Sequence, residues 1–379
     1  MRILIYNWRD LAHPKAGGAE VYTDRVAGEW VAMGHQVTLF CSAVDGLAEY
    51  EQSGSGYSIV RRGSRHSVYR EAKKYWMETG SEYYDLVVDE VNTRPFGCPK
   101  YVGAVPVLAL VHQVAREVWF YETIFPVALF GRFFLEPYWL RGYRDVPTVT
   151  VSASSRESLH LYGLRNVTVV PEGFDVVEPL TDVQKEAAMT LIFVGRLSRN
   201  KRPHHALKVH QIVRKTFPDV QLWMIGSGPM EKRLRRKVIP GLVWHGRVSD
   251  DDKRRLMARA TLLLATSVRE GWGLAVSEAA AMGTPAAGYD VAGLRDSVLA
   301  SGGIVTRGSC KDLANGVLTQ LRSSAYGSEN VGPRGVVPWS SVAVDILDVV
   351  PVDRASTMGT QQGEIGATEV VESAGLGSR

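Results

Sequence analysis

The stretch TLLLATSVREGWGLAVSEAAAMG, residues 261–283, contains the local elements that decide the fold. It begins with an apolar run that predicts a buried strand, passes through a glycine-containing turn, and ends in an alanine-rich run that predicts a helix. The start of that helix should carry four unpaired amides, those of Gly271, Trp272, Gly273 and Leu274. Free N–H groups and the positive end of a helix dipole together favour phosphate oxygens, and glycine lets a ligand approach the backbone closely.

Two glutamates flank this turn. Glu278 lies eight residues beyond Glu270, a separation of roughly 12 Å along a helix axis at about 1.5 Å per residue. That separation suits a ligand with a hydroxyl-rich group at each end and a diphosphate between them. The alternative is a glycine turn that caps a core helix, with Glu278 in solvent, and spacing alone leaves both interpretations open.

Strand and helix patterns alternate through most of the chain, which predicts an α/β fold with mostly parallel sheets. Strands are expected at residues 1–7, 35–42, 84–92, 105–113 and 147–155, and then at 191–196, 220–226, 242–247, 261–267 and 284–290. The pattern indicates two doubly wound units in succession. Ligands of such sheets bind beyond the carboxyl ends of the strands, so the cleft between the units is the expected site.

The polar, strand-poor stretch at residues 172–186 marks the boundary between the two units. We expect a first Rossmann-like domain at 1–175 and a second, nucleotide-sugar-binding domain at 176–335. Residues 336–350 follow as a late amphipathic helix that crosses back to the first domain, although valines leave a strand open. Gly, Ser, Thr and Glu dominate residues 351–379, which predicts a disordered tail.

Composition narrows the class of protein. The chain has 379 residues, 45% of them hydrophobic and 22% charged, which is typical of a globular protein with two cores. A net charge of +4 suits phosphorylated ligands or an anionic surface but is too small for a nucleic-acid-binding protein. Cys41, Cys98 and Cys310 are too far apart for a metal cluster or a disulfide framework, which favours a reducing cytoplasm.

Membrane segments are not expected. The first residues, MRILIYNWRD, turn polar too early for a secretory signal, and no apolar run approaches the roughly 20 residues that span a bilayer. The aromatic and arginine-rich segment at 119–144 leaves three interpretations open: contact with an acceptor, packing around the first sheet, or contact with a membrane surface. The expected location is therefore cytoplasmic, with peripheral membrane association as an open alternative.

A basic loop, GRLSRNK, follows the first strand of the second unit. It places Arg196 at the carboxyl end of the strand and Lys201 five residues later. A guanidinium fork and an ammonium group there would hold a diphosphate leaving group. A solvated basic loop is the alternative.

Three further features bear on the site. Gly17 and Gly18 lie between the first strand and first helix, where backbone can reach a ligand from the opposite domain. His112 ends a buried strand where the site elements converge, although a core histidine is the alternative. The run Asp250–Asp252 precedes a helical pattern, so helix capping is favoured over a metal site, and no metal is expected.

Three elements occur in order and at characteristic spacing: GGAE at residues 17–20, GRLSRNK at 195–201, and EGWGLAVSEAAAMGTP at 270–285. In combination they resemble the retaining family 4 glycosyltransferases. The wider stretches YNWRDLAHPKAGGAE, residues 6–20, and VDEVNTRPFGCP, residues 88–99, resemble a bacterial branch that serves cell-surface glycans or natural products. The resemblance implies the GT-B fold, in which two Rossmann-like domains face a central cleft. It covers roughly residues 1–325.

The resemblance also implies roles at the donor. Glu270 would contact hydroxyls of the donor sugar, Glu278 would accept the ribose hydroxyls, and His112 would lie beside the sugar. Backbone around Val248 would face the nucleobase.

The diphosphate has its own implied contacts. Arg196 and Lys201 would neutralise it as it leaves, and the amides of Gly271, Trp272, Gly273 and Leu274 would hold sugar and phosphate. Gly17 and Gly18 would meet the phosphates from the first domain.

The implied reaction moves a hexosyl group from a nucleoside-diphosphate sugar to an acceptor hydroxyl, with retention and without metal or cofactor. The acceptor would be a small molecule, a glycan or a lipid-linked sugar, and no prediction of oligomeric state follows. A sugar-nucleotide 2-epimerase and a non-catalytic nucleotide-sugar-binding protein are the alternatives. The chain departs from the family pattern at Trp272, at Pro203 and at Glu172, the last in PEGFD, which leaves a donor contact for Glu172 open.

Overall fold

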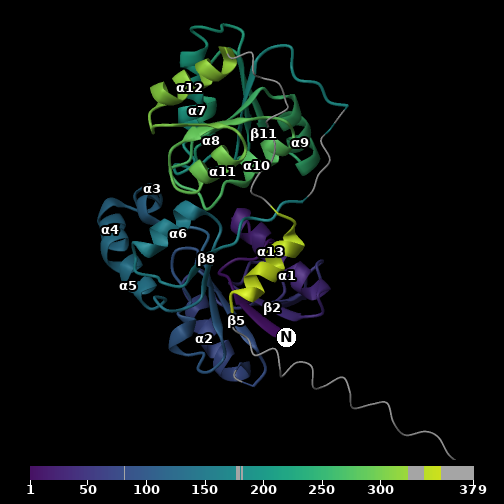
Figure 1. The fold of residues 1–379 in the computed structure, drawn as a ribbon, viewed down its shortest axis with the longest axis vertical. Helices are drawn as coiled ribbons and strands as arrows, with labels where there is room; N and C mark the ends of the chain where they lie inside the picture. Colours follow the sequence, from purple (N-terminus) through teal and green to yellow (C-terminus); the bar gives the residue numbers. More distant parts are fainter. Residues whose placement is uncertain (81, 176–179, 181, 323–336, 351–379) are drawn as a thin grey trace, which may run out of the picture.

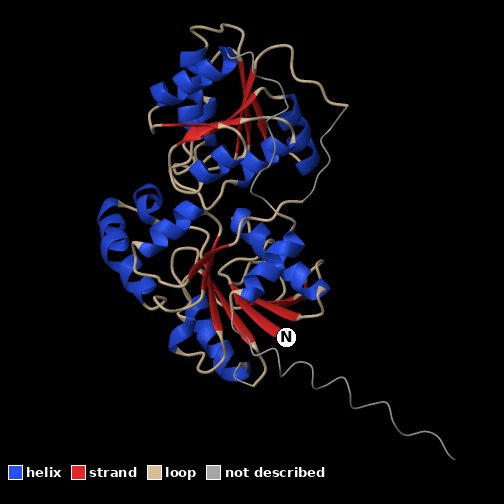
Figure 2. Ribbon diagram, in the orientation of Figure 1, coloured by secondary structure: helices blue, strands red, loops and turns tan. Residues whose placement is uncertain are grey.

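Two sheets, one in each half of the chain, organise the computed structural model (Figures 1 and 2). The structure describes residues 1–80, 82–175, 180, 182–322 and 337–350. The predicted α/β class with two doubly wound units is confirmed.

The first sheet has eight strands in the order β3-β4-β2-β1-β5-β6-β7-β8. All neighbours pair in parallel except β3 and β4. The strands are β1 (Arg2–Tyr6), β2 (Gln36–Cys41), β3 (Tyr50–Gln52), β4 (Ser58–Arg61), β5 (Leu86–Glu90), β6 (Val107–Leu110), β7 (Thr148–Thr150) and β8 (Val167–Val169). The direction of winding reverses between β1 and β5, and a doubly wound sheet opens a crevice at such a point.

Helices cover both faces of this sheet (Figure 2). They are α1 (Gly18–Ala32), α2 (Val68–Thr79), α3 (Trp119–Glu122), α4 (Phe125–Phe130), α5 (Glu136–Arg141) and α6 (Ala153–His160), with short helical turns η1 (Cys98–Lys100), η2 (Arg116–Val118) and η3 (Gly131–Leu135). The segment from α3 to α5 lies along one outer side of the domain (Figure 1).

The second sheet has six strands in the order β11-β10-β9-β12-β13-β14, all in parallel. Its strands are β9 (Thr190–Val194), β10 (Gln221–Ile225), β11 (Leu242–Gly246), β12 (Leu262–Ala265), β13 (Ala286–Tyr289) and β14 (Ile304–Thr306). Its helices are α7 (Pro203–Val213), α8 (Glu231–Arg235), α9 (Asp250–Arg259), α10 (Leu274–Ala281), α11 (Leu294–Ala300) and α12 (Cys310–Arg322). The winding reverses between β9 and β12, so the loops after these two strands meet at one crevice.

The central strands are apolar throughout because helices bury both of their faces. β1 and β5 are almost fully buried, as are β9 and β12. The strands β3, β4, β8 and β14 were not predicted. β3, β8 and β14 consist of exposed or half-buried residues and so lack the apolar run that marks the central strands. All three cysteines are buried and unpaired.

The late segment forms a helix, α13 (Trp339–Asp348), that packs against α1 of the first domain (Figure 1). The indole Nε1 of Trp30 donates to the carbonyl of Ala343 at 2.9 Å. Gly173 and Val337 form a β-bridge, so two connections between the domains run side by side. A side chain at Gly173 would collide with the Trp339 ring, its Cβ lying 2.3 Å away. The predicted tail, 351–379, lies outside the described residues.

The start of α10 differs from the sequence-based expectation. The helix begins at Leu274, and its N-cap Gly273 has φ 104°, a backbone conformation that favours glycine. Gly271 and Trp272 therefore belong to the preceding turn, and their amides are not first-turn donors. Glu270 also lies outside the helix, so the 12 Å helical separation from Glu278 does not apply.

Candidate active site

The loops after β9 and β12 are bonded to each other at the crevice of the second sheet. Thr266 Oγ1 donates to the carbonyls of Lys201 at 2.8 Å and Arg202 at 3.1 Å. The amide of Val268 donates to the carbonyl of Asn200 at 2.8 Å. These bonds hold the basic loop against the turn that carries Glu270, which we call the glutamate turn. Lys201 and Glu270 are 69 residues apart in the sequence.

Glu270 and Lys201 form an ion pair across these two loops. Lys201 Nζ donates to Glu270 Oε1, and Ser267 Oγ donates to the same oxygen at 2.5 Å. The Glu270 side chain keeps 15% of its surface exposed and that of Lys201 keeps 31%. The carboxylate is thus fixed in direction while one side of it stays open to a ligand.

Arg196 is exposed in the same loop. Within the described ranges, no hydrogen bond or ion pair involves its guanidinium. It is not brought into contact with Glu270, and its charge is available to an incoming anion.

His112 lies just beyond β6 in the first domain and is buried. Its Nε2 shares a hydrogen bond with Glu90 Oε1 at 3.3 Å, while its Nδ1 is buried without a partner. Asn7 Nδ2 at 2.8 Å and Thr23 Oγ1 at 2.6 Å donate to the other oxygen of Glu90, so the carboxylate that orients the ring is itself held.

The charge state of His112 reflects two opposed effects. Burial lowers its pKa, but the hydrogen bond that the ring donates to Glu90 and the charges of Glu90, Glu172 and Glu20 raise it, and the net shift is upward. Sequence reasoning missed Glu90. The sequence feature that could have pointed to Glu90 is the pair of acidic residues, Asp89 and Glu90, near the end of the buried strand YDLVVDEVN.

The two domains meet closely at Gly271 and His112. A Cβ added at Gly271 would lie 3.0 Å from the His112 carbonyl oxygen and 3.2 Å from its Cβ. Ser155 Oγ donates to the same carbonyl at 3.1 Å, which fixes it in place. The turn that carries Glu270 therefore lies directly against the strand end that carries His112.

A second close approach joins Gly18 to the start of α10. A Cβ at Gly18 would lie 3.4 Å from Leu274 Cδ1. The amide of Gly17 already donates to Glu20 Oε2 at 2.6 Å, and Glu20 pairs with Arg9 at 2.7 Å. Gly18, the first residue of α1, thus lies against the start of α10, where free amides favour phosphate.

Trp272 faces the first domain. Its side chain is buried in the apolar cluster of the first sheet, and its Nε1 donates to Ser277 Oγ at 2.9 Å. The indole ties the glutamate turn to the opposite domain, so a donor contact at this position would come from its backbone.

Glu278 is paired. Lys253 Nζ lies 3.0 Å from Glu278 Oε1 and 3.0 Å from Asp250 Oδ1. Val248, half-buried, packs against the apolar cluster beside α9 and α10. A ribose bound here would share the Glu278 carboxylate with Lys253.

The aspartate run starts α9 as expected. Ser249 caps the helix by accepting from the amide of Asp252 at 3.1 Å, and the acidic side chains occupy the first turn. Among the described residues, no group of three or more His, Cys, Asp or Glu side chains is placed to hold a metal ion.

Glu172 is a further carboxylate near the site, which sequence reasoning left open. It is buried, and its Oε2 has no hydrogen-bond partner. Burial raises its pKa to about 7, with His112 and Lys201 acting to lower it and Glu270 and Glu278 to raise it. The charges of all four groups act on Glu172, which places it within electrostatic range of the site.

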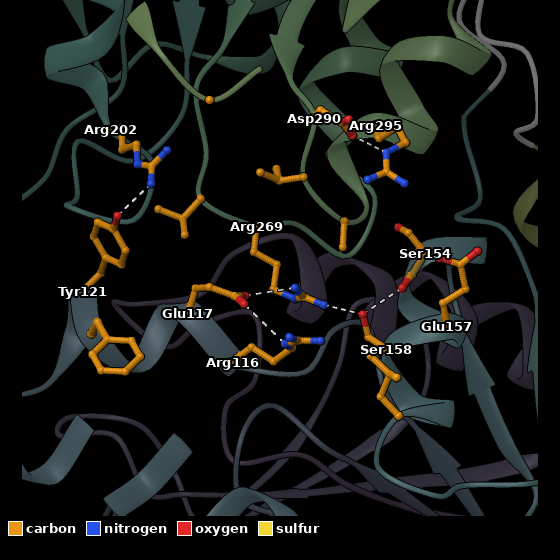
Figure 3. A pocket seen from close by; sticks show the side chains of 16 residues that line it. Arg116, Glu117, Tyr121, Ser154, Glu157, Ser158, Arg202, Arg269, Asp290 and Arg295 are labelled. Atoms are coloured by element: carbon orange, nitrogen blue, oxygen red, sulfur yellow. Dashed lines mark hydrogen bonds and ion pairs between the residues drawn. The ribbon is translucent and has the colours of Figure 1, made fainter. Parts of the chain in front are cut away.

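Arg269 crosses the domain junction next to the glutamate turn (Figure 3). Its Nη2 donates to Ser158 Oγ at 2.5 Å, and its Nη1 lies 3.1 Å from Glu117 Oε2. Beside it is a cavity of about 710 Å³, lined from both domains by residues that include Arg116, Tyr121, Ser158, Arg202, Arg269 and Arg295. The lining includes Arg269 and Arg202, the chain neighbours of Glu270 and Lys201, but not Glu270, Lys201 or His112 themselves.

Comparisons with known proteins agree with this architecture. Residues 16–178 match the family model described as Glycosyltransferase Family 4, and residues 188–323 match Glycosyl transferases group 1. The chain is 25% identical over 374 residues to a GDP-mannose-dependent alpha-(1-6)-phosphatidylinositol dimannoside mannosyltransferase of Mycobacterium tuberculosis, covering 91% of this chain and 95% of the relative.

Two solved structures share the fold. Sucrose-phosphate synthase from Thermosynechococcus elongatus superposes with a TM-score of 0.76 at 16% identity, covering 92% of this chain and 98% of that one. Anabaena HepE in complex with UDP-glucose superposes with a TM-score of 0.64 at 17% identity, covering 92% and 97%. The two family models together cover both domains and the loops that form the crevice. The chain therefore belongs to the family 4 glycosyltransferases of GT-B fold, and its activity is that of a sugar-nucleotide-dependent glycosyltransferase.

Proposed function

We propose that this glycosyltransferase moves a hexosyl group from a nucleoside-diphosphate sugar to an acceptor hydroxyl with retention of anomeric configuration and without a metal ion. The observation that carries the proposal is the contact between Gly271 and the His112 carbonyl. It brings the Lys201–Glu270 pair of one domain against the buried histidine of the other.

The donor would lie along the crevice of the second sheet. We assign the sugar to Glu270 and His112, since the carboxylate is held by Lys201 and Ser267 but stays partly open. The His112 Nδ1 atom, buried and unpartnered, is suited to a sugar hydroxyl. We assign the ribose to Glu278 and the nucleobase to the backbone near Val248, on the far side of α10.

The diphosphate would lie at the N-terminus of α10. There the amides of Leu274 and its neighbours lack helical partners, and Gly18 approaches from the other domain. Arg196 and Lys201 supply the positive charge that a departing diphosphate requires. These two cations support metal-independent catalysis because they can perform the charge neutralisation that a divalent ion performs elsewhere.

Retention follows from attack on the face that the diphosphate leaves, with an oxocarbenium-like transition state. The leaving phosphate oxygen would take the acceptor proton while Lys201 and Arg196 stabilise the negative charge that remains. A double displacement would instead need a carboxylate nucleophile. Glu172 is the candidate for that route, but its pKa of about 7 leaves it largely protonated in mildly acidic solution, and a protonated carboxyl is a poor nucleophile.

Lipid-linked acceptors are the acceptor class that we favour over soluble ones. A relative that is matched over 95% of its length is named as a phosphatidylinositol dimannoside mannosyltransferase, and phosphatidylinositol dimannoside is a lipid. Peripheral contact with a cytoplasmic membrane surface would present such an acceptor to the cleft. Among the described residues, no helix is long and apolar enough to cross a membrane.

The test is a transfer assay with purified protein. A panel of nucleotide sugars is first screened by thermal shift, where a true donor at a hundredfold its dissociation constant adds about 2.7 kcal/mol to the unfolding free energy. Release of nucleoside diphosphate is then followed with and without acceptor, and the anomeric configuration of the product is read by NMR. Chelator should leave the rate unchanged. Sugar epimerisation without acceptor would identify the 2-epimerase instead, and donor binding without turnover would identify a binding protein.

A further inference from the structure

An outward-facing row of large apolar side chains, five of the six aromatic, runs along α4, η3 and α5. These three elements form one continuous helical stretch, residues 125–141. We call the row the aromatic stripe: Phe125, Leu129, Phe130, Phe133, Phe134 and Tyr138. These six side chains are exposed, whereas Ala128, Gly131, Glu136 and Leu140 are the buried residues of the same stretch, so the six lie on its outward side. Phe125, Phe134 and Tyr138 are 70%, 65% and 62% exposed, although aromatic side chains are normally buried.

The opposite face of this helix is fixed to the domain by a buried carboxylate. Glu136 is 1% exposed and accepts from the amides of Ala115 at 2.5 Å and Arg116 at 3.0 Å, and from the hydroxyl of Tyr162 at 2.9 Å. Gly131 lies under the Trp119 ring, where a Cβ would be 2.4 Å from ring carbon. The helix cannot roll to bury its aromatic face without breaking these bonds, so the fold itself holds the stripe outward.

A basic cluster lies at the α5 end of the stripe and consists of Lys100, Arg141 and Arg144. Lys100 Nζ lies 5.4 Å from the Tyr138 ring centroid, and its Cε lies 3.8 Å from a Cβ built on Gly142. Arg141 and Arg144 are exposed. None of the three takes part in an ion pair among the described residues. Their charges are therefore unneutralised beside an exposed apolar face.

We propose that the aromatic stripe and the basic cluster together bind the surface of an anionic lipid bilayer. Aromatic rings enter the interface between headgroups and acyl chains, while lysine and arginine contact anionic headgroups. The bilayer is favoured as the occupant because the basic cluster lies beside the exposed rings, and anionic headgroups complement its charge. α3 contacts α4, and its residues Phe120 and Tyr121 line the interdomain cavity. Docking would therefore hold the domain junction close to an acceptor in the lipid surface, and in this respect the inference rests on the proposed function.

The test is co-sedimentation of the full-length protein with vesicles. One set of vesicles contains phosphatidylcholine alone, and the other contains equal parts of phosphatidylcholine and phosphatidylglycerol. We expect the protein to sediment with the anionic vesicles and the bound fraction to fall as salt is raised. Failure to sediment with either set overturns the proposal.

Variants locate the surface. The double variant Phe133→Ser/Phe134→Ser should weaken vesicle binding at least tenfold, whereas Met77→Ser, which removes an equally exposed apolar side chain of α2, should bind as the parent does. Arg141→Ala/Arg144→Ala should lose the preference for anionic vesicles, and Lys208→Ala/Lys215→Ala, which removes two exposed lysines of the second domain, should keep it. Equal binding by the Phe133/Phe134 variant and the parent would overturn the assignment.

Two parallel measurements separate the outcomes. Sedimentation equilibrium without vesicles detects self-association, and a dimer that the Phe133/Phe134 variant abolishes, without vesicle binding, would overturn the bilayer as occupant. Thermal shift with UDP-glucose and GDP-mannose measures donor binding in every variant and shows that each is folded. If the parent binds none of the nucleotide sugars of the full panel, the proposed function is contradicted. If the parent binds a donor but not the vesicles, the docking surface alone is contradicted.

Discussion

Lys201 donates a hydrogen bond from Nζ to Oε1 of Glu270, so the cation and the carboxylate of two separate loops form one joined pair. The pair lies where the winding of the second sheet reverses, between β9 and β12. A leaving diphosphate would attract Lys201 while the sugar contacts Glu270. Each member of the pair is therefore expected to matter more for turnover than for stability.

Glu270→Gln should lower kcat by about 100-fold to 1,000-fold, the usual cost of removing one group that stabilises transition-state charge. The unfolding free energy should change by less than about 1 kcal/mol because the pair with Lys201 is partly exposed. Nucleoside diphosphate release and chemical denaturation measure the two effects. Glu231→Gln, which removes a carboxylate from the Arg235 pair of α8, is the control. Near-parental turnover of Glu270→Gln would contradict the assigned role.

Arg196→Ala and Lys201→Ala should each reduce the rate of the transfer step by at least about tenfold, because each removes one charge from the leaving diphosphate. Single-turnover measurements isolate that step from product release. Arg199→Ala is the matched control, since it removes an exposed arginine from the same loop. If Arg196→Ala and Lys201→Ala both keep the full transfer rate, the loop does not hold the diphosphate.

The raised pKa of Glu172 predicts that the stability of the protein depends on pH. Because its folded pKa is raised from 4.5 to about 7, the folded state binds more protons than the unfolded state between these values. The contribution of Glu172 to the unfolding free energy is fully present below the unfolded pKa and is lost as pH rises through about 7. The loss amounts to about 3 kcal/mol, at 1.36 kcal/mol per pKa unit. Denaturation of the parent and of Glu172→Gln at about pH 5 and about pH 8 measures it, and the variant should have the flatter profile. A profile of the same slope in both proteins would contradict this assignment.

The same variant tests the reaction route. Front-face attack needs no carboxylate nucleophile, so Glu172→Gln should keep kcat within about tenfold of the parent. A loss as large as that of Glu270→Gln, with a glycosyl group trapped on the parent enzyme, would favour double displacement through Glu172.

Glu90 is a positioning residue for His112. Glu90→Gln replaces a charged partner with a neutral one, so the pKa of His112 should fall from its raised value. Imidazole NMR titration measures this shift. His210 is the control, since its ring forms a hydrogen bond with the carbonyl of Val220 and it lies far from Glu90 in the sequence. The pKa of His210 should be the same in both proteins. An unchanged His112 pKa would show that Glu90 does not set its charge.

Local patterns predicted much of the fold because their signals are short-range. Apolar runs bounded by turns located the central strands. Gly17, Lys201 and Glu270 lie in loops that follow strands, where ligands of such sheets bind, and Gly18 begins α1. The start of α10 was misjudged by three residues. Glycines occur on both sides of Trp272, and only the backbone angles show that Gly273 is the cap.

The residues that sequence reasoning missed act across long chain separations. Glu90 reaches Asn7 over 83 residues and His112 over 22, and Arg269 reaches Ser158 over 111. No periodicity records such a contact, since the partners lie on different elements and even on different domains. A buried acid at a strand end becomes meaningful when its hydrogen-bond partners are known.

The sequence alone therefore determined the alternation of strands and helices, the two doubly wound domains and the loops that carry the charged groups. Hydrophobic periodicity and glycine punctuation encode these features locally. The tertiary structure alone decided which loops meet, that Gly271 lies against His112, and that the aromatic stripe faces outward. Helical periodicity marks a face but does not say which side is solvent. Here the buried Glu136 carboxylate, bonded to two amides and a tyrosine, decides that orientation.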